Sequence, residues 1–191
     1  MTIKLNNVKI TQVTDPFKAN VAETLFITTG QTLSQRRMDR MWTALKRLPY
    51  QSYSCVKAPD DTRYLMGKTD DIIANLEGRD YNIGPYFVCI SDNSIITRQS
   101  NPIHLFPEYD PGTQNRHLHH AANFDPGINH PLLARPSWCW ASIGPSYVSA
   151  LQDTDIVDMF RLLYIFIIRL NWASPLRSQW KYEAMDHGVL V

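Results

Sequence analysis

Seven of the 12 prolines of this 191-residue chain fall between Pro102 and Pro145, a stretch with no helical or strand periodicity. Proline fixes φ and lacks a backbone donor, so regular helices and strands are expected outside this stretch. Loops longer than about 15 residues are usually either functional or disordered. The two large apolar side chains of Trp138 and Trp140 favour a packed loop. The sequence therefore predicts one long functional loop in the second half of the chain.

The composition is that of a single folded domain covering residues 1–191. Hydrophobic residues make up 44% and charged residues 19% of the chain, which argues against an extended disordered protein. Lys and Arg number 19 and Asp and Glu number 18, and this net charge of +1 argues against non-specific binding to nucleic acid. We divide the domain into an N-terminal β extension, residues 1–33, and a core, residues 34–191.

No segment is predicted to enter a membrane. The most apolar run, residues 162–168, lies between Arg161 and Arg169 and is far shorter than the roughly 20 residues that span a bilayer. The N-terminus has no basic stretch followed by an apolar core, so it does not resemble a secretory signal. We therefore expect a cytoplasmic protein with no membrane partner.

An amphipathic helix is predicted to follow Ser34, which is a suitable N-cap. The helix is expected to end at Leu48, because Pro49 disfavours helical geometry in the residue before it. Its apolar residues recur at helical spacing and are Met38, Met41, Trp42, Leu45 and Leu48. Its other face is basic and consists of Arg36, Arg37, Arg40, Lys46 and Arg47. An ordinary solvated face is the simplest interpretation of this charge cluster.

Short runs rich in β-branched and aromatic residues predict an antiparallel meander after this helix. The runs are residues 50–56, 63–66, 86–90 and 94–98, and residues 69–76 are expected to add one or two helical turns.

Further elements are predicted at both ends of the chain. Alternation over residues 3–10 and the β-rich residues 24–29 predict a small N-terminal strand pair, with the turn signal Asp15-Pro16 between them. An apolar helix is expected from Ile156 to about residue 170, and residues 177–185 are expected to form a final helix.

Histidines of the long loop are candidate metal ligands. His117 and His119 would project to the same side of a strand, next to His120, and His130 is available to join them. A structural zinc site generally needs four converging ligands, and no Cys-His or H-E-x-x-H spacing accompanies these histidines. A solvated polar loop is the simpler interpretation, and we predict no metal and no other cofactor.

Of the three cysteines, Cys139 is the candidate nucleophile. The odd number and the lack of C-x-x-C spacing fit neither a disulfide framework nor a zinc site. Cys55 and Cys89 alternate within predicted strands, as small core residues do, whereas Cys139 lies in the predicted functional loop. The alternative is a buried thiol between Trp138 and Trp140.

The residues around Cys139 follow one another in a distinctive order. Asn129-His130-Pro131-Leu132 comes first, and Cys139 lies nine residues after His130. The apolar helix and the segment Asn-Trp-Ala-Ser-Pro-Leu, residues 171–176, follow. This order resembles the ubiquitin-conjugating enzyme family, whose members have a His-Pro-Asn motif, a catalytic cysteine, a crossover helix and an Asn-Pro-rich segment ending in Pro-Leu. The predicted basic helix and meander come in the family's order too, so the resemblance spans about residues 34–185.

The resemblance implies an α+β, ubiquitin-conjugating-enzyme-like fold. Its parts are an N-terminal helix, an antiparallel β-meander, a long active-site loop, a crossover helix and a C-terminal helix, here with an extra N-terminal strand pair. In this family the basic face of the first helix binds the activating enzyme.

The resemblance also implies an acyl transferase. Cys139 would accept the C-terminal glycine of a ubiquitin-like protein as a thioester and pass the acyl group to an amine. Asn129 or a backbone amide near Cys139 would stabilise the oxyanion, and Ser174 would orient the incoming amine. His130 and Pro131 would be structural residues at the site.

Several positions depart from the family pattern. Leu132 stands where the family has its oxyanion asparagine, Trp138 replaces a small or aliphatic residue, and Ser174 replaces an acid at the gate position. This divergence looks more like the conjugating-enzyme-like proteins of prokaryotic ubiquitin-like operons, which are often antiviral. Two alternatives stay open: a catalytically inactive conjugating-enzyme-like binding or scaffold module, and a viral or mobile-element structural protein whose loop makes subunit contacts.

Overall fold

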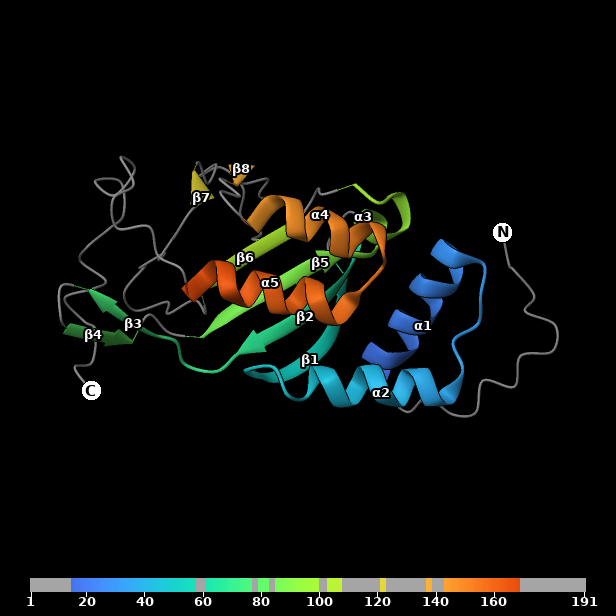
Figure 1. The fold of residues 1–191 in the computed structure, drawn as a ribbon, viewed down its shortest axis with the longest axis horizontal. Coiled ribbons are helices and arrows are strands. Elements are labelled where there is room, and N and C mark those ends of the chain that lie inside the picture. The colour runs from blue at the N-terminus through green and yellow to red at the C-terminus, as the bar shows by residue number, and fades with distance from the viewer. Residues whose placement is uncertain are drawn as a thin grey trace.

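The computed structural model describes residues 15–57, 61–76, 79–82, 85–99, 103–107, 121–122, 137–138 and 143–168, and its fold is α+β (Figure 1). The helices of this part of the chain are α1 (Pro16–Thr29), α2 (Gln35–Leu45), α3 (Asp92–Thr97), α4 (Gly144–Gln152) and α5 (Ile156–Ile168). The strands are β1 (Tyr50–Lys57), β2 (Arg63–Thr69), β3 (Ile73–Leu76), β4 (Arg79–Asn82), β5 (Tyr86–Ser91), β6 (Ile103–Pro107), β7 (Ala121–Ala122) and β8 (Ser137–Trp138).

Four strands form an antiparallel sheet in the order β1-β2-β5-β6. Leu65 of β2 is the register partner of both Cys55 in β1 and Ile90 in β5. The β3–β4 hairpin is inserted between β2 and β5 and forms a separate two-stranded sheet, as do β7 and β8. Apart from the hairpin, strands that follow one another in the chain are neighbours, which confirms the meander predicted from residues 50–56, 63–66 and 86–90.

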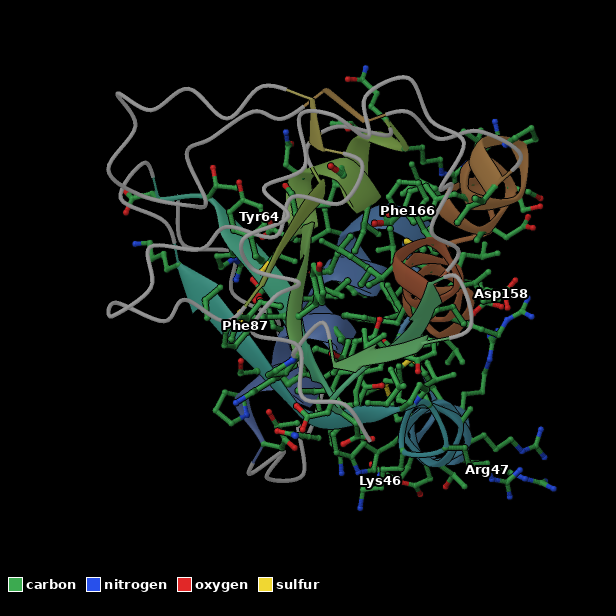
Figure 2. All side chains as sticks on the ribbon, turned by 90° about the vertical axis from the view of Figure 1, so that its left-hand side faces the viewer. Lys46, Arg47, Tyr64, Phe87, Asp158 and Phe166 are labelled. Carbon is green, nitrogen blue, oxygen red and sulfur yellow. The ribbon has the colours of Figure 1, made fainter. Side chains whose placement is uncertain are left out.

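The main hydrophobic core lies between this sheet and the helices. Leu65 and Ile90 are completely buried in it, together with Phe160 of α5. Successive strand residues point to opposite faces. Tyr64 and Cys89 therefore lie on the other face, in a separate small cluster of buried residues. Figure 2 shows Tyr64 on the side of the sheet that is turned away from α5.

Helix α1 replaces one of the two predicted N-terminal strands, so the prediction for residues 24–29 is wrong. Asp15 is the N-cap of α1, its carboxylate accepting a hydrogen bond of 3.0 Å from the Phe17 N–H, and Pro16 occupies the first turn. Gly30, at a φ of 68°, ends the helix and donates its N–H to the Phe26 carbonyl. Asp-Pro and Gly are helix start and stop signals here, and they outweigh the β propensity of the residues between them. The other predicted strand, residues 3–10, lies outside the described residues.

Helix α2 confirms the predicted amphipathic helix. The Ser34 hydroxyl accepts a hydrogen bond of 3.4 Å from the Arg37 N–H, and the side chains of Met38 and Leu45 are buried. The helix ends at Leu45, earlier than predicted, and residues 46–49 form a turn that leads into β1. The predicted N-cap and apolar spacing are therefore correct. The predicted end of the helix, placed directly before Pro49, is three residues too late.

Two short elements differ in type from the prediction. Residues 69–76, predicted to be helical, form the end of β2 and the strand β3. Residues 94–98, predicted to be a strand, belong to α3 and its C-cap. Ser91 accepts a hydrogen bond from the Ser94 N–H as the N-cap of α3, and Arg98 closes it at a φ of 55°. A run of β-branched residues this short does not distinguish a strand from a buried helical turn.

The C-terminal helices complete the described fold. The Asp155 carboxylate accepts a hydrogen bond of 3.0 Å from the Asp158 N–H at the start of α5, which confirms the predicted apolar helix. Helix α4 was not predicted, because its Pro145 was counted with the irregular stretch, whereas proline is tolerated in the first turn of a helix. None of the helices in the described ranges is long and apolar enough to cross a bilayer. The predicted helix at residues 177–185 lies outside those ranges.

Candidate functional site

The residues predicted to form the catalytic site lie outside the described part of the chain. They are Asn129, His130, Pro131, Cys139 and Ser174, and the same holds for the candidate metal ligands His117, His119 and His120. The described segment closest in sequence to Cys139 is β8, which ends at Trp138 and pairs with β7. Among the residues that are described, no group of three or more His, Cys, Asp or Glu side chains is arranged to hold a metal ion.

The two described cysteines are poor nucleophiles. Cys89 is completely buried on β5, and this burial raises the pKa of its thiol well above the usual range. Cys55 on β1 is half-buried, and desolvation also raises its pKa, in spite of an opposing effect of the nearby Arg63 guanidinium. Because the thiolate is the attacking species, both thiols are weakly reactive at neutral pH. Cys139 is therefore the cysteine left as a candidate for covalent chemistry.

The basic residues predicted on the first amphipathic helix lie on α2 and on the turn that follows it, and we call this set of residues the α2 basic face. It consists of Arg36, Arg37, Arg40, Lys46 and Arg47, all of which are exposed. None of them forms an ion pair with a described residue, and the one acidic side chain of α2, Asp39, accepts a hydrogen bond from Gln35 instead. Figure 2 shows Lys46 and Arg47 at the outer side of α2. This face is therefore a set of cations available to an acidic surface.

A sixth cation, Lys18 of α1, lies beside this face and was not predicted from the sequence. Its ammonium lies 4.6 Å from the ring centroid of Trp42, and the ammonium of Lys46 lies 5.4 Å from the same centroid. The indole of Trp42 is thus shared by two lysines from different helices, each within the range of a cation–π interaction. Lys18 was missed because its segment was assigned to the linker of a strand pair, and only helix–helix packing places it beside Trp42.

Aromatic packing holds the indole in place. The Trp42 ring lies 6.0 Å from Phe17 of α1 and 5.8 Å from Tyr53 of β1, measured between centroids. The Tyr53 hydroxyl donates a hydrogen bond of 2.8 Å to the Leu45 carbonyl at the end of α2. Burial raises the pKa of Tyr53, so its hydroxyl keeps the proton that it donates. The helix that carries three of these cations, Arg36, Arg37 and Arg40, is therefore fixed to both α1 and the sheet.

Comparison of the chain with protein-family models, with curated proteins and with solved structures gives no match.

Proposed function

We propose that this protein is a conjugating enzyme for a ubiquitin-like protein and that Cys139 carries the acyl group. The observation that supports the proposal is the order of the elements: the basic helix α2, an antiparallel meander of chain-order neighbours, and the apolar helix α5. This is the order that the resemblance to the ubiquitin-conjugating family implies. The residues around Cys139 are the second support, and the ubiquitin-conjugating-enzyme-like arrangement of the site is part of what we propose.

The proposed reaction consists of two acyl transfers. The Cys139 thiolate attacks the thioester carbonyl that joins the terminal glycine of the ubiquitin-like protein to the activating enzyme, and the thiolate of that enzyme leaves. An acceptor amine then attacks the new thioester, Cys139 leaves as a thiolate, and the amine gives up a proton to solvent. Each tetrahedral intermediate carries an oxyanion that needs a hydrogen-bond donor. Asn129 is the proposed donor, Ser174 the residue that orients the amine, and His130 and Pro131 shape the loop.

The α2 basic face is the proposed docking site for the activating enzyme. Its five cations have no described acidic partner within this chain, so an acidic partner surface would find them uncompensated. Long-range attraction of this kind accelerates encounter more than it strengthens the final complex. Charge reversal on this face is therefore expected to slow the loading of Cys139 without changing the chemistry of the thiol.

Acyl transfer is tested with a short peptide that ends in glycine and is activated as its 2-mercaptoethanesulfonate thioester. The expected product is the protein with one added acyl group on Cys139, found by mass spectrometry and removed by hydroxylamine. Cys139→Ala is expected to abolish the product, and Cys55→Ala to leave it unchanged. An acyl group that appears equally on Cys55, or only on the denatured protein, would contradict the proposal.

A second candidate, a non-catalytic binding module with the same fold, is favoured by one observation. The α2 basic face and its lysine-flanked Trp42 consist of described residues of α1, α2 and the turn that follows α2. Two measurements distinguish the candidates: the acyl-transfer assay on Cys139, and the affinity of the protein for an acidic partner. Binding that is lost in Arg37→Glu/Arg40→Glu, together with no acyl product on Cys139, would identify the binding module.

A further inference from the structure

Two polar side chains of α1 are buried without a hydrogen-bond partner among the described residues. Asn20 is 5% exposed and Thr24 is 0% exposed, and in this part of the chain neither the Asn20 Nδ2 nor the Thr24 hydroxyl has a partner. Burying one such group without a hydrogen bond costs about 1–3 kcal/mol. The two residues are one helical turn apart, so their Cβ atoms are about 5–6 Å from each other on the same side of the helix. Two unsatisfied groups at this spacing are unusual within one helix.

The Thr24 hydroxyl differs from those of the other threonines of α1. Thr28 and Thr29 each donate a hydrogen bond of 2.7 Å to the carbonyl four residues earlier, those of Thr24 and Leu25. Thr24 makes no such bond to the Asn20 carbonyl, although this is the usual partner of a threonine inside a helix. The local helix geometry therefore does not satisfy this hydroxyl, and its partner has to come from outside α1.

Asn20 and Thr24 lie next to the side of α1 from which Glu23 is connected to α3 by ion pairs. At 100° per residue, both lie between the core-facing Val21 and the outer Glu23. The Glu23 carboxylate accepts a hydrogen bond of 2.9 Å from Arg63 of β2, whose Nε donates at 2.8 Å to the carboxylate of Asp92 in α3. Helices α1 and α3 are in contact, and we call this contact the α1–α3 seam. The Glu23–Arg63–Asp92 ion pairs lie on the outer side of this seam.

We propose that the α1–α3 seam holds an internal water molecule that accepts a hydrogen bond from Asn20 Nδ2 and is hydrogen-bonded to the Thr24 hydroxyl. Side chains whose Cβ atoms are about 5–6 Å apart can direct their polar atoms at one water molecule and both reach it with a hydrogen bond. Internal waters in proteins make two to four hydrogen bonds to buried polar groups that otherwise lack partners. Both carboxylates at the seam, those of Glu23 and Asp92, already have Arg63 as their cationic partner, so the unsatisfied groups of α1 are the neutral side chains of Asn20 and Thr24. The water would satisfy both buried side chains independently of any catalytic role of Cys139.

The oxygen-17 relaxation dispersion of the solvent counts long-lived internal waters in the full chain and is not affected by exchanging hydroxyl protons. Replacing both partners, Asn20→Leu/Thr24→Val, is expected to lower the amplitude of the dispersion by the contribution of one water molecule. The matched control is Thr28→Val, which removes a hydroxyl that already has a partner on the same helix and should leave the amplitude unchanged. An amplitude that is the same in the double variant and the wild type would overturn the proposal.

Urea denaturation gives a second, independent test with single variants. If the water is bound, Asn20→Leu and Thr24→Val each lower the denaturation midpoint. Each variant removes one of the two hydrogen bonds of the water, so that the remaining side chain is bonded to a water with one partner fewer. The double variant then lowers the midpoint by less than the sum of the two. Thr24→Ser, which keeps the hydroxyl, is expected to keep the water. If the seam is dry, both apolar replacements raise the midpoint and their effects add, and this result would also overturn the proposal.

Discussion

Gly67 of β2 lies directly against the ring of Tyr50, so that a Cβ at position 67 would be 2.8 Å from the Tyr50 Cδ1 atom. The same Cβ would be 3.1 Å from Cε1 of Phe160, which leaves no free direction for a methyl group. Glycine ordinarily weakens a strand, but here it allows the sheet to approach the aromatic core closely.

Gly67→Ala is therefore expected to reduce the free energy of unfolding by about 1–3 kcal/mol, as overpacking of a core does. Urea denaturation measures this loss. In a Tyr50→Ala background the clash partner is gone, so the same change at position 67 should cost much less. An equal loss in both backgrounds would show that the Tyr50 ring is not the cause.

Thr154 lies in the turn between α4 and α5 at a φ of 54°, a conformation that a β-branched residue rarely adopts. The turn is fixed by a hydrogen bond of 2.8 Å from the Asp155 N–H to the Ala150 carbonyl. Thr154→Gly is expected to raise the free energy of unfolding by about 0.5–1 kcal/mol, because relief of the left-handed strain exceeds the added chain entropy. Thr154→Ala keeps the Cβ and is the control. A glycine variant no more stable than the alanine variant would contradict this account.

Arg63 and Arg161 form ion pairs of equal length but unequal burial. Arg63 donates at 2.8 Å to Asp92, whose side chain is only 11% exposed, whereas the partner of Arg161, Asp158, is 40% exposed. Arg63→Ala leaves a nearly buried carboxylate unpaired and is expected to destabilise the protein by about 1–3 kcal/mol. Arg161→Ala should cost less than about 1 kcal/mol, because solvent screens an exposed pair. Thermal denaturation of the two variants, side by side, checks the difference, and equal losses would argue against it.

The buried thiol of Cys89 is expected to make stability fall at alkaline pH. Burial raises the folded-state pKa of Cys89 above its unfolded value of about 8.5. The folded state then keeps a proton that the unfolded state loses, so stability is complete below about pH 8.5 and declines as the pH rises further. Above about pH 8.5, one such group lowers the free energy of unfolding by about 1.4 kcal/mol per pH unit, up to its folded-state pKa. Between pH 9 and 10, Cys89→Ala should therefore show a shallower decline in chemical denaturation than the wild type, and parallel curves would contradict this assignment.

The elements that the sequence predicts well are those with local signals at both ends and a clear period between them. For α2, Ser34 and the spacing of Met38 and Leu45 were sufficient, and the α2 basic face followed from the same spacing. For α1 the signals were present, but Asp15 and Pro16 were assigned to a turn although they start a helix.

Features that depend on packing could not be predicted in this way. The place of Lys18 beside Trp42 depends on how α1 lies against α2, and the burial of Asn20 and Thr24 depends on α3. No pattern within a single segment contains this information, because each contact joins residues from elements far apart in the chain. The catalytic residues around Cys139 remain predictions from their order in the sequence.

The reactivity of Cys139 is the point on which the proposed function depends. Iodoacetamide labelling of the native protein at neutral pH, followed by mass spectrometry of each cysteine peptide, measures it directly. We predict that Cys139 is modified fastest, that half-buried Cys55 follows slowly, and that Cys89 reacts only after unfolding. A Cys139 that reacts no faster than Cys55 in the folded protein would contradict the assignment of this thiol as the acyl carrier.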